Sequence, residues 1–246
     1  MDTTQLLYGV VLALVVSLAA YRARALNPSG AAAAAVLGAV VFGLGGLAWA
    51  VLLLAFFISS SGLSRLFKRR KAGLDEKFSK GSRRDAGQVL ANGGIAGVFV
   101  LLHLFFPGQA WPWMGFAGAL AAANADTWAT ELGVLSRSLP RLITNGRAVE
   151  RGTSGAISLA GTASALSGGL LIGLLAGVLW RWASPLTLPP AWSAAAGIAA
   201  WVTLSGLAGS LVDSLLGATL QAIYTCPACQ KETERHPIHL CGAQTT

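Results

Sequence analysis

Six long apolar stretches, separated by short basic or proline-containing segments, constrain this chain more than any other feature. A helix that spans a membrane needs roughly 20 predominantly apolar residues. Hydrophobic residues make up 54% of the chain and charged residues only 11%, whereas soluble domains carry roughly 25% charge. A lipid-facing surface accounts for this composition, because a helix satisfies its own backbone hydrogen bonds. We therefore predict an all-α, polytopic helical bundle within a membrane.

The apolar stretches predict about seven transmembrane helices. Residues 29–64 are too many for one crossing, so we expect the chain to fold back at Gly43, Gly45 and Gly46. The first span is expected to be retained, since Met1–Thr4 lacks the basic residues of a cleaved signal. The last stretch predicts one tilted helix or a helix broken near residues 206–209. The predicted spans cover residues 5–21, 30–44, 46–64, 86–106, 112–135, 154–180 and 191–224.

The basic residues predict the orientation of the bundle. With the N-terminus outside, all 18 lysines and arginines except Arg181 fall in the inner loops or the tail. The positive-inside rule then places the C-terminus in the cytoplasm. The net charge of +8 therefore favours a membrane protein over a nucleic-acid partner. We expect a catalytic transmembrane domain over residues 1–224 and a cytoplasmic Cys/His tail over 225–246. The host membrane would be a bacterial inner membrane or its organellar equivalent.

Tryptophan side chains are expected to mark the outer ends of the helices. The five that should form this belt are Trp111, Trp113, Trp180, Trp182 and Trp192.

Acidic side chains inside the predicted spans indicate a functional site. Asp126 and Glu131 lie in the fifth span with Asn124, and Asp213 lies in the last span. Charged groups in a membrane are costly and usually functional. A helix rise of ~1.5 Å per residue from Pro112 puts Asp126 about 21 Å from the outer end, in the inner half. Three carboxylates near one face suit Mg²⁺, which prefers oxygen ligands. The alternative is that these groups cap helix ends or pair with loop arginines.

A second half of the site is predicted where the sixth span begins. It consists of Arg151-Gly152-Thr153-Ser154-Gly155. Backbone N–H groups at a helix N-terminus, with glycines and hydroxyl side chains, can bind an anion. An ordinary N-cap role for Thr153 or Ser154 is the alternative. Facing the carboxylates, this turn would hold a phosphate beside Mg²⁺.

The C-terminal tail contains a pattern of metal-binding residues. Cys226-Pro-Ala-Cys229 is followed by His236, His239 and Cys241. The C-x-x-C and H-x-C spacing predicts a structural zinc site on the cytoplasmic side, completed by Cys226, Cys229, His239 and Cys241. His236 is a substitute ligand, and a disordered, reduced tail is the alternative.

Five blocks of the sequence span almost the whole chain. They are Arg84–Gly94, Asn124–Gly133, Pro140–Thr144, Gly152–Leu159 and Gly209–Gln221. Together and in this order, they resemble an integral-membrane family that includes plant phytyl-phosphate kinase. Members of that family usually continue past the Cys/His segment with another apolar stretch, whereas this chain ends at Thr246, as a shortened or natural variant would.

The resemblance implies phosphorylation of an isoprenoid monophosphate to its diphosphate, and distant kinship with CTP-dependent phytol and dolichol kinases. The partners would be a nucleoside triphosphate, CTP above others, a prenyl phosphate and the bilayer. Because a phosphate-monoester acceptor is already anionic, catalysis would consist of positioning and charge neutralisation. Asp126, Glu131 and Asp213 would bind Mg²⁺, with Asn124 beside them. The implied phosphate-binding residues are Arg84, Gln88, Asn92, Arg141, Arg147, Gly152, Thr153, Ser154, Gly155 and Ser158.

Four alternatives stay open from the sequence: two other enzymes, a transporter and a scaffold. A lipid alcohol kinase would use one of the acids as a base, and a cytidylyltransferase would release pyrophosphate. A cation-coupled transporter would place its acids near the midplane, often within inverted repeats. The acids here lie toward one face and no internal repeat is evident. A scaffold without catalytic activity would leave the acids unexplained.

Overall fold

Seven long helices account for most of the chain, as the apolar stretches predict. The computed structural model describes residues 3–67, 83–136, 138–183, 192–233, 236–239 and 241–246. The helices in these residues are α1 (Thr3–Arg22), α2 (Pro28–Val40), α3 (Leu47–Phe67), α4 (Ala86–Phe105), α5 (Trp111–Gly133), α6 (Leu159–Ala183) and α7 (Trp192–Thr219). A π-helical segment, η1 (Val41–Gly45), continues α2. Two antiparallel strand pairs complete the fold: β1 (Arg141–Leu142) with β2 (Ala156–Ile157), and β3 (Tyr224–Cys226) with β4 (Lys231–Thr233).

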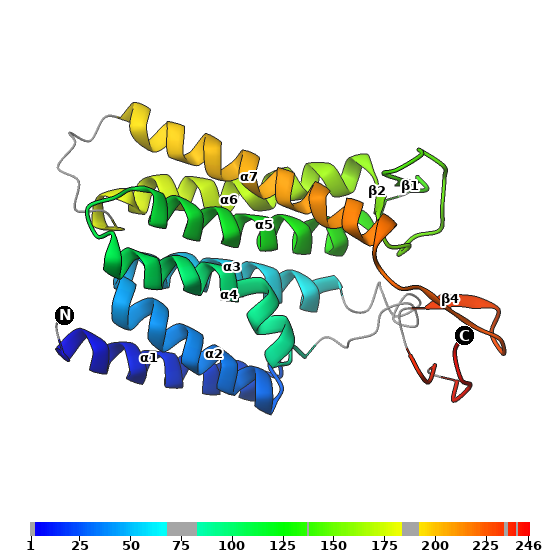
Figure 1. Ribbon diagram of the computed structural model, residues 1–246, viewed down its shortest axis with the longest axis horizontal. Helices are drawn as coiled ribbons and strands as arrows, with labels where there is room; N and C mark the ends of the chain where they lie inside the picture. The colour runs from blue at the N-terminus through cyan, green and yellow to red at the C-terminus, as the bar shows by residue number, and fades with distance from the viewer. Residues whose placement is uncertain (1–2, 68–82, 137, 184–191, 234–235, 240) are drawn as a thin grey trace.

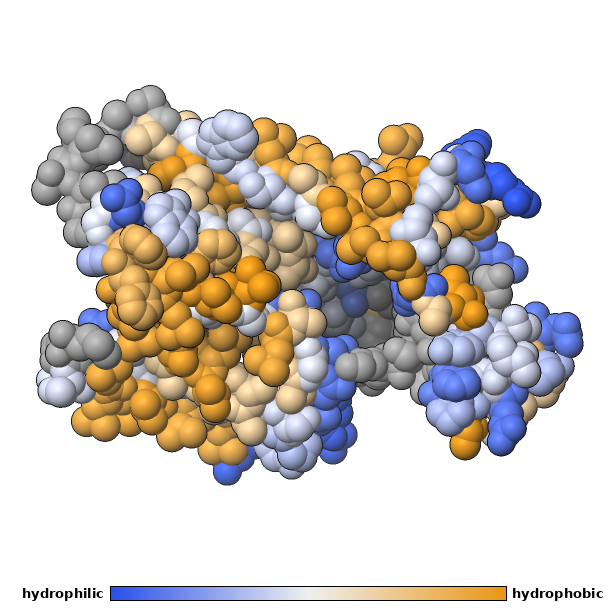
Figure 2. All heavy atoms as spheres, viewed as in Figure 1, coloured by the Kyte–Doolittle hydropathy of each residue, from blue (hydrophilic) through white to orange (hydrophobic). Residues whose placement is uncertain are grey.

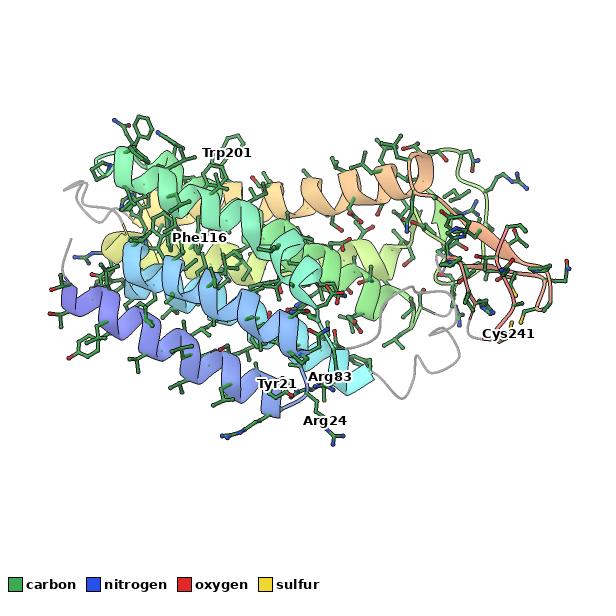
Figure 3. The ribbon with its side chains drawn as sticks, turned by 60° about the horizontal axis from the view of Figure 1, so that its bottom comes forward. Tyr21, Arg24, Arg83, Phe116, Trp201 and Cys241 are labelled. Carbon is green, nitrogen blue, oxygen red and sulfur yellow. The ribbon has the colours of Figure 1, made fainter. Side chains whose placement is uncertain are left out.

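The helices lie side by side, and successive helices run in opposite directions along the bundle (Figure 1). The N-terminus lies at one end of the bundle and the Cys/His tail at the other. The turn after α1, the β1–β2 hairpin and the tail therefore share one end, which we call the basic end. Arg24 and Arg83 lie there, and the Arg83 guanidinium is 5.9 Å from the ring centroid of Tyr21 (Figure 3). The predicted sidedness of the charges is thus present in the fold, and the cytoplasmic assignment of that end stays a prediction.

Apolar side chains cover the outside of the helices. Leu7 on α1, Ile58 on α3 and Trp201 on α7 are each more than 60% exposed. Hydrophobic residues spread over the body of the bundle in Figure 2, and hydrophilic residues gather mainly at the basic end. A surface of this kind is stable against lipid rather than water, which confirms a membrane bundle.

Six of the helices in the described residues are long and apolar enough to cross a membrane, and α5 is the exception. This helix carries Asn124, Asp126 and Glu131, which lower its hydropathy. It packs closely against α6 and α7 and also contacts α3 and α4. A helix enclosed by others can hold polar groups that lipid would not tolerate. The structure therefore agrees with seven helices while making α5 the interior one.

The long stretch 29–64 folds back where the glycines predicted. The backbone leaves the helical conformation at Gly46, whose φ is +86°. A residue with a Cβ is strained at this angle, whereas glycine is not. The side-chain amide of Gln5 donates a hydrogen bond to the Gly43 carbonyl at 3.1 Å, which ties the turn to α1.

The boundaries of two predicted spans shift in the structure. The sixth helix begins at Leu159 rather than residue 154, because the preceding residues pair as β2. Ser158 is the residue that caps it, since its Oγ accepts a hydrogen bond from the Gly161 N–H at 3.0 Å. The last helix is continuous and ends at Thr219 rather than residue 224.

An aromatic cluster fills the core at the end opposite the basic end. Trp49, Trp113 and Phe116 are almost fully buried, and the ring centroids of Trp49 and Trp113 lie 5.2 Å apart. The prediction of a tryptophan belt is therefore wrong for Trp113, which packs inside the bundle. Trp182 is 72% exposed, as a belt residue should be.

Helices α6 and α7 approach so closely at Gly173 that a methyl group added there should lower the stability of the bundle. A Cβ on Gly173 would lie 2.5 Å from the Ala199 carbonyl oxygen and 2.5 Å from Thr203 Oγ1, whereas a Cβ on Gly197 would meet nothing within 4 Å. We expect Gly173→Ala to destabilise the bundle by about 1–3 kcal/mol. Gly197→Ala should be neutral or stabilising by up to ~1 kcal/mol, because alanine favours a helix. Thermal unfolding in detergent would measure both, and equal melting temperatures would contradict the close approach.

Candidate functional site

A cavity of about 400 Å³ lies between α5, α6, α7 and the segment 151–158. It lies at the basic end. Asp126 of α5 and Asp213 of α7 both line it, and their carboxylates interact electrostatically. Hydroxyl groups surround them. The hydroxyl residues that line the cavity are Thr130, Thr153, Ser154, Ser158, Thr162, Ser210 and Ser214.

Helix α5 presents two polar faces to different neighbours. Asp126, Thr130 and Gly133 recur at i, i+4 and i+7 and line the cavity. Asn124 and Glu131 lie on the face toward α3, where Ser59 and Ser64 donate hydrogen bonds to them at 2.9 Å. The structure therefore brings together two of the three predicted magnesium ligands and turns Glu131 away from them.

Asn124 links three helices and does not line the cavity. Its side chain is fully buried. Its Oδ1 accepts the hydrogen bond from Ser59, and its Nδ2 donates to the Gly168 carbonyl of α6 at 2.8 Å. Both halves of the amide are thus satisfied by neighbouring helices. This arrangement gives Asn124 a structural role, away from the two aspartates of the cavity.

Removal of the Asn124 amide should lower stability. Asn124→Ala would leave the Gly168 carbonyl without its donor and open a small cavity, which we expect to cost about 2–3 kcal/mol. Ser59→Ala should cost less, about 1 kcal/mol, because it removes a single hydroxyl and leaves the bond from Asn124 Nδ2 to the Gly168 carbonyl in place. Thermal unfolding of both variants would test this order. A fully stable Asn124→Ala protein would show that the amide is dispensable for packing.

Glu131 belongs to a polar cluster between α3 and the start of α4. Arg84 interacts electrostatically with Glu131 and donates a hydrogen bond from Nη2 to Ser60 Oγ at 3.0 Å. The Arg84 guanidinium also lies 5.8 Å from the ring centroid of Phe56. Burial lowers the pKa of Arg84, and Glu131 opposes that shift. Arg84 therefore serves as a partner of Glu131 and of α3.

The predicted anion-binding turn is present, but it belongs to a hairpin and not to a helix N-terminus. Its positive-φ residues are Gly152 (φ +81°) and Gly155 (φ +74°). The Thr153 and Ala156 N–H groups donate to carbonyls within the turn, to Glu150 O and Thr153 O. The Ser154 hydroxyl donates to Gln221 Oε1, just beyond the end of α7. An anion bound at this turn would therefore contact its side chains and its remaining backbone N–H groups, and would not face a helix dipole.

Of the three arginines near the cavity, only Arg151 lines it, whereas Arg141 and Arg147 were the predicted phosphate-binding residues. Arg151 lines the cavity beside the turn. Arg141 is exposed and donates from Nη1 to the Gly146 carbonyl at 2.8 Å, which closes the β1–β2 hairpin. Arg147 is exposed on the same hairpin, outside the cavity lining.

Gln88 and Asn92 line a separate, mainly apolar cavity between α1, α2, α3 and α4. The volume of this second cavity is about 90 Å³, and Arg84 also lines it. Gln88 Oε1 accepts from the Asp85 N–H at 3.1 Å while Asp85 Oδ1 accepts from the Gln88 N–H at 2.8 Å. This reciprocal pair caps α4. The predicted phosphate-binding residues of the fourth span thus lie away from the two aspartates.

The residues of the main cavity fit a magnesium ion through oxygen donors. Two carboxylates and several hydroxyls are hard ligands of the kind Mg²⁺ uses together with water and substrate phosphates. Within the described residues, no group of three or more acidic, cysteine or histidine side chains forms there. The protein would therefore supply Asp126 and Asp213, and the remaining ligands would come from water or substrate.

The tail brings Cys226, Cys229, His239 and Cys241 together as predicted, with their ligand atoms within 4.8 Å of one another. Hydrogen bonding with Cys241 raises the pKa of the Cys229 thiol to about 11. Hydrogen bonding with His239 lowers the pKa of the Cys241 thiol to about 6. His236 does not join them: its Nδ1 lies 3.2 Å from Thr245 Oγ1, and its ring stacks on Tyr224.

Two residues that line the main cavity, Thr130 and Thr162, were not predicted from the sequence, because threonines are common in helices. A signal existed for Thr130, which follows Asp126 by one helical turn. Arg151 was predicted as part of the second half of the site, and it lines the cavity.

The fold and the cavity define a class: a polytopic membrane helical bundle with an acidic, hydroxyl-lined cavity at its basic end. Within this class, the chain belongs to the family described as "Integral membrane protein DUF92", whose model matches residues 11–245. No solved structure matches the chain.

Three curated relatives illustrate the range of the family. Protein PGR of Arabidopsis thaliana is 32% identical over 240 residues, which cover 92% of this chain and 83% of the relative. Uncharacterized membrane protein MJ0933 of Methanocaldococcus jannaschii is 34% identical over 219 residues, covering 88% of this chain and 84% of the relative. Protein VTE6, chloroplastic, of Arabidopsis thaliana is 26% identical over 200 residues, covering 80% of this chain and 56% of the relative.

Proposed function

We propose that this protein is a membrane phosphotransferase that converts an isoprenoid monophosphate, phytyl or another prenyl phosphate, to its diphosphate. The phosphoryl donor is a nucleoside triphosphate, with CTP favoured. The observation that carries the proposal is the main cavity, where Asp126 and Asp213 lie opposite a glycine- and hydroxyl-rich turn beside Arg151. The resemblance of the sequence blocks to the phytyl-phosphate kinase family supports it.

The chemistry requires positioning more than acid–base catalysis. A phosphate oxygen of the acceptor forms a bond to the γ-phosphorus of the donor. The bond from that phosphorus to the β,γ-bridging oxygen breaks, and the nucleoside diphosphate leaves with the electron pair. Because the acceptor oxygen is already anionic, no protein base has to remove a proton.

The cavity residues have distinct roles in this proposal. Asp126 and Asp213 would hold Mg²⁺, which when bound neutralises phosphate charge and aligns donor and acceptor. Arg151 would contact phosphate oxygens, and Thr153 and Ser154 would donate hydrogen bonds to them. These side chains gather at the basic end, where a water-soluble nucleotide can enter.

The prenyl chain has an apolar route from the cavity to the bilayer. Helices α6 and α7 flank the cavity and expose Leu166, Leu170, Leu215 and Leu216. An acceptor bound with its phosphate among the polar residues can therefore keep its hydrocarbon tail in lipid, so that the tail is not exposed to water.

The test is a product analysis with the purified full chain. Labelled CTP, ATP, UTP or GTP is incubated with Mg²⁺ and prenyl monophosphates of several lengths. A prenyl diphosphate with a nucleoside diphosphate is the expected result. A CDP-lipid with pyrophosphate would indicate a cytidylyltransferase instead, and phosphorylation of the free alcohol would indicate an alcohol kinase. No product from any combination would refute phosphotransfer.

A further inference from the structure

We infer that the C-terminal tail is a zinc-binding module whose fold depends on one metal ion held by Cys226, Cys229, His239 and Cys241. The inference rests on the geometry of the tail and is independent of the proposed phosphotransfer. Either can fail while the other holds, because the tail ligands do not line the main cavity.

The four ligand atoms lie within 4.8 Å of one another, close to the spacing of a tetrahedral zinc site. Zinc–sulfur bonds of about 2.3 Å and zinc–nitrogen bonds of about 2.0 Å place neighbouring ligand atoms about 3.5–3.8 Å apart. In the tail, Cys226 Sγ lies 3.5 Å from Cys241 Sγ, and Cys229 Sγ lies 3.8 Å from His239 Nδ1. His239 Nδ1 lies 3.2 Å from Cys241 Sγ. None of the three cysteines forms a disulfide.

Two similar turns present these ligands. In the first turn, the Gln230 N–H donates to the Cys226 carbonyl at 2.8 Å, and Gln230 has a φ of +55° directly after Cys229. In the second, the Gly242 N–H donates to the His239 carbonyl at 2.9 Å, and Gly242 has a φ of +85° directly after Cys241. Each turn therefore delivers two ligands toward the same point from opposite parts of the tail.

The tail has little else to hold it together. Its buried described residues are Cys226, Thr233, His239 and Thr245, and the only hydrophobic one among them is a cysteine ligand. Ile238 is 58% exposed. The backbone contributes a short hairpin, a pair of hydrogen bonds between Thr225 and Thr246, and bonds from the His239 and Thr245 N–H groups to the Ala243 and Pro237 carbonyls. A module this small and this polar needs a cross-link or a metal, since it buries too little apolar surface to fold alone.

The experiment measures metal content in the full chain, purified without a histidine tag or chelator. Elemental analysis should find about one zinc per chain. Cys229→Ser and His239→Ala should each lower the bound zinc at least ~10-fold, since even outer-shell changes cost 10–100-fold in affinity. His236→Ala is the matched control and should keep the ion, because this histidine contacts Thr245 and Tyr224 instead.

Two further measurements apply to the unaltered protein and do not depend on how the variants fold. Replacement of zinc by Co²⁺ should give the visible absorption of a tetrahedral thiolate site. Chelation should speed cleavage of the tail by trypsin while the helical bundle stays intact. A protein that lacks bound metal and fails to take up Zn²⁺ or Co²⁺ would overturn the inference. A disulfide among the cysteines, or equal zinc loss in His236→Ala and His239→Ala, would overturn it as well.

Discussion

Replacement of Asp126 by asparagine should lower turnover in the prenyl-phosphate assay by about 10²–10³-fold. The change preserves the size of the side chain and removes the negative charge that would hold Mg²⁺ in the cavity. Metal coordination of a transferring phosphoryl group is worth several kcal/mol, and each 1.36 kcal/mol is about tenfold in rate. Asp213→Asn should have a similar effect, because both carboxylates line the same cavity.

The double variant tests whether the two aspartates act as a unit. If they hold one ion together, Asp126→Asn with Asp213→Asn should cost little more than either change alone. The matched control is Asp85→Asn. This acid also lies at the basic end but caps α4, and asparagine is an equally good N-cap. Full turnover in Asp126→Asn, or an equal loss in Asp85→Asn, would remove the metal assignment.

A single methyl group at Gly155 should displace the turn that faces the aspartates. A Cβ at this position would lie 2.3 Å from Ala218 Cβ and 2.5 Å from Ala218 N on α7. The backbone of α7 cannot move away cheaply, so the turn itself must shift. We expect Gly155→Ala to lower turnover by at least ~10²-fold, since a displacement of about 1 Å at a reacting centre can cost that much.

Gly146 provides the control that separates contact from backbone strain. Its φ of +70° is close to the +74° of Gly155, but a Cβ on Gly146 would meet nothing within 4 Å. Both alanine variants therefore carry the same left-handed strain of about 1–2 kcal/mol, and only Gly155→Ala adds the collision. Thermal unfolding and turnover of the pair should diverge. Equal melting temperatures and equal turnover in the two variants would mean that the contact between this turn and α7 has no role.

The pattern of apolar residues was sufficient to predict the helical bundle. Each predicted span corresponds to one helix, and the fold-back at Gly46 follows from a stretch too long for a single crossing. Span ends were less accurate. The start of α6 moved from residue 154 to Leu159, because pairing of β2 with β1 depends on residues that are distant in the sequence.

The candidate site was predicted in part. Asp126 and Asp213 were expected to meet, and both line the cavity. Glu131 was expected to join them, but a helix places residues five apart on different faces, so it meets Ser64 of α3 instead. Arg141, Gln88 and Asn92 were grouped with the site through the resemblance to the kinase family. Such a resemblance does not say which helices are neighbours in this fold, and these residues bond within a hairpin or line another cavity.

The sequence by itself determines properties that depend on neighbouring residues or on sums along the chain. Apolar length predicts spans, the charge of the loops predicts which ends lie together, and the spacing of Cys226, Cys229, His239 and Cys241 predicts a cluster because the tail is short. Tertiary structure alone decides which face of α5 meets which helix. That choice depends on close packing at glycines such as Gly168 and Gly155, where one added carbon would separate the elements. Packing of this kind is a property of pairs of helices, and no single stretch of sequence contains it.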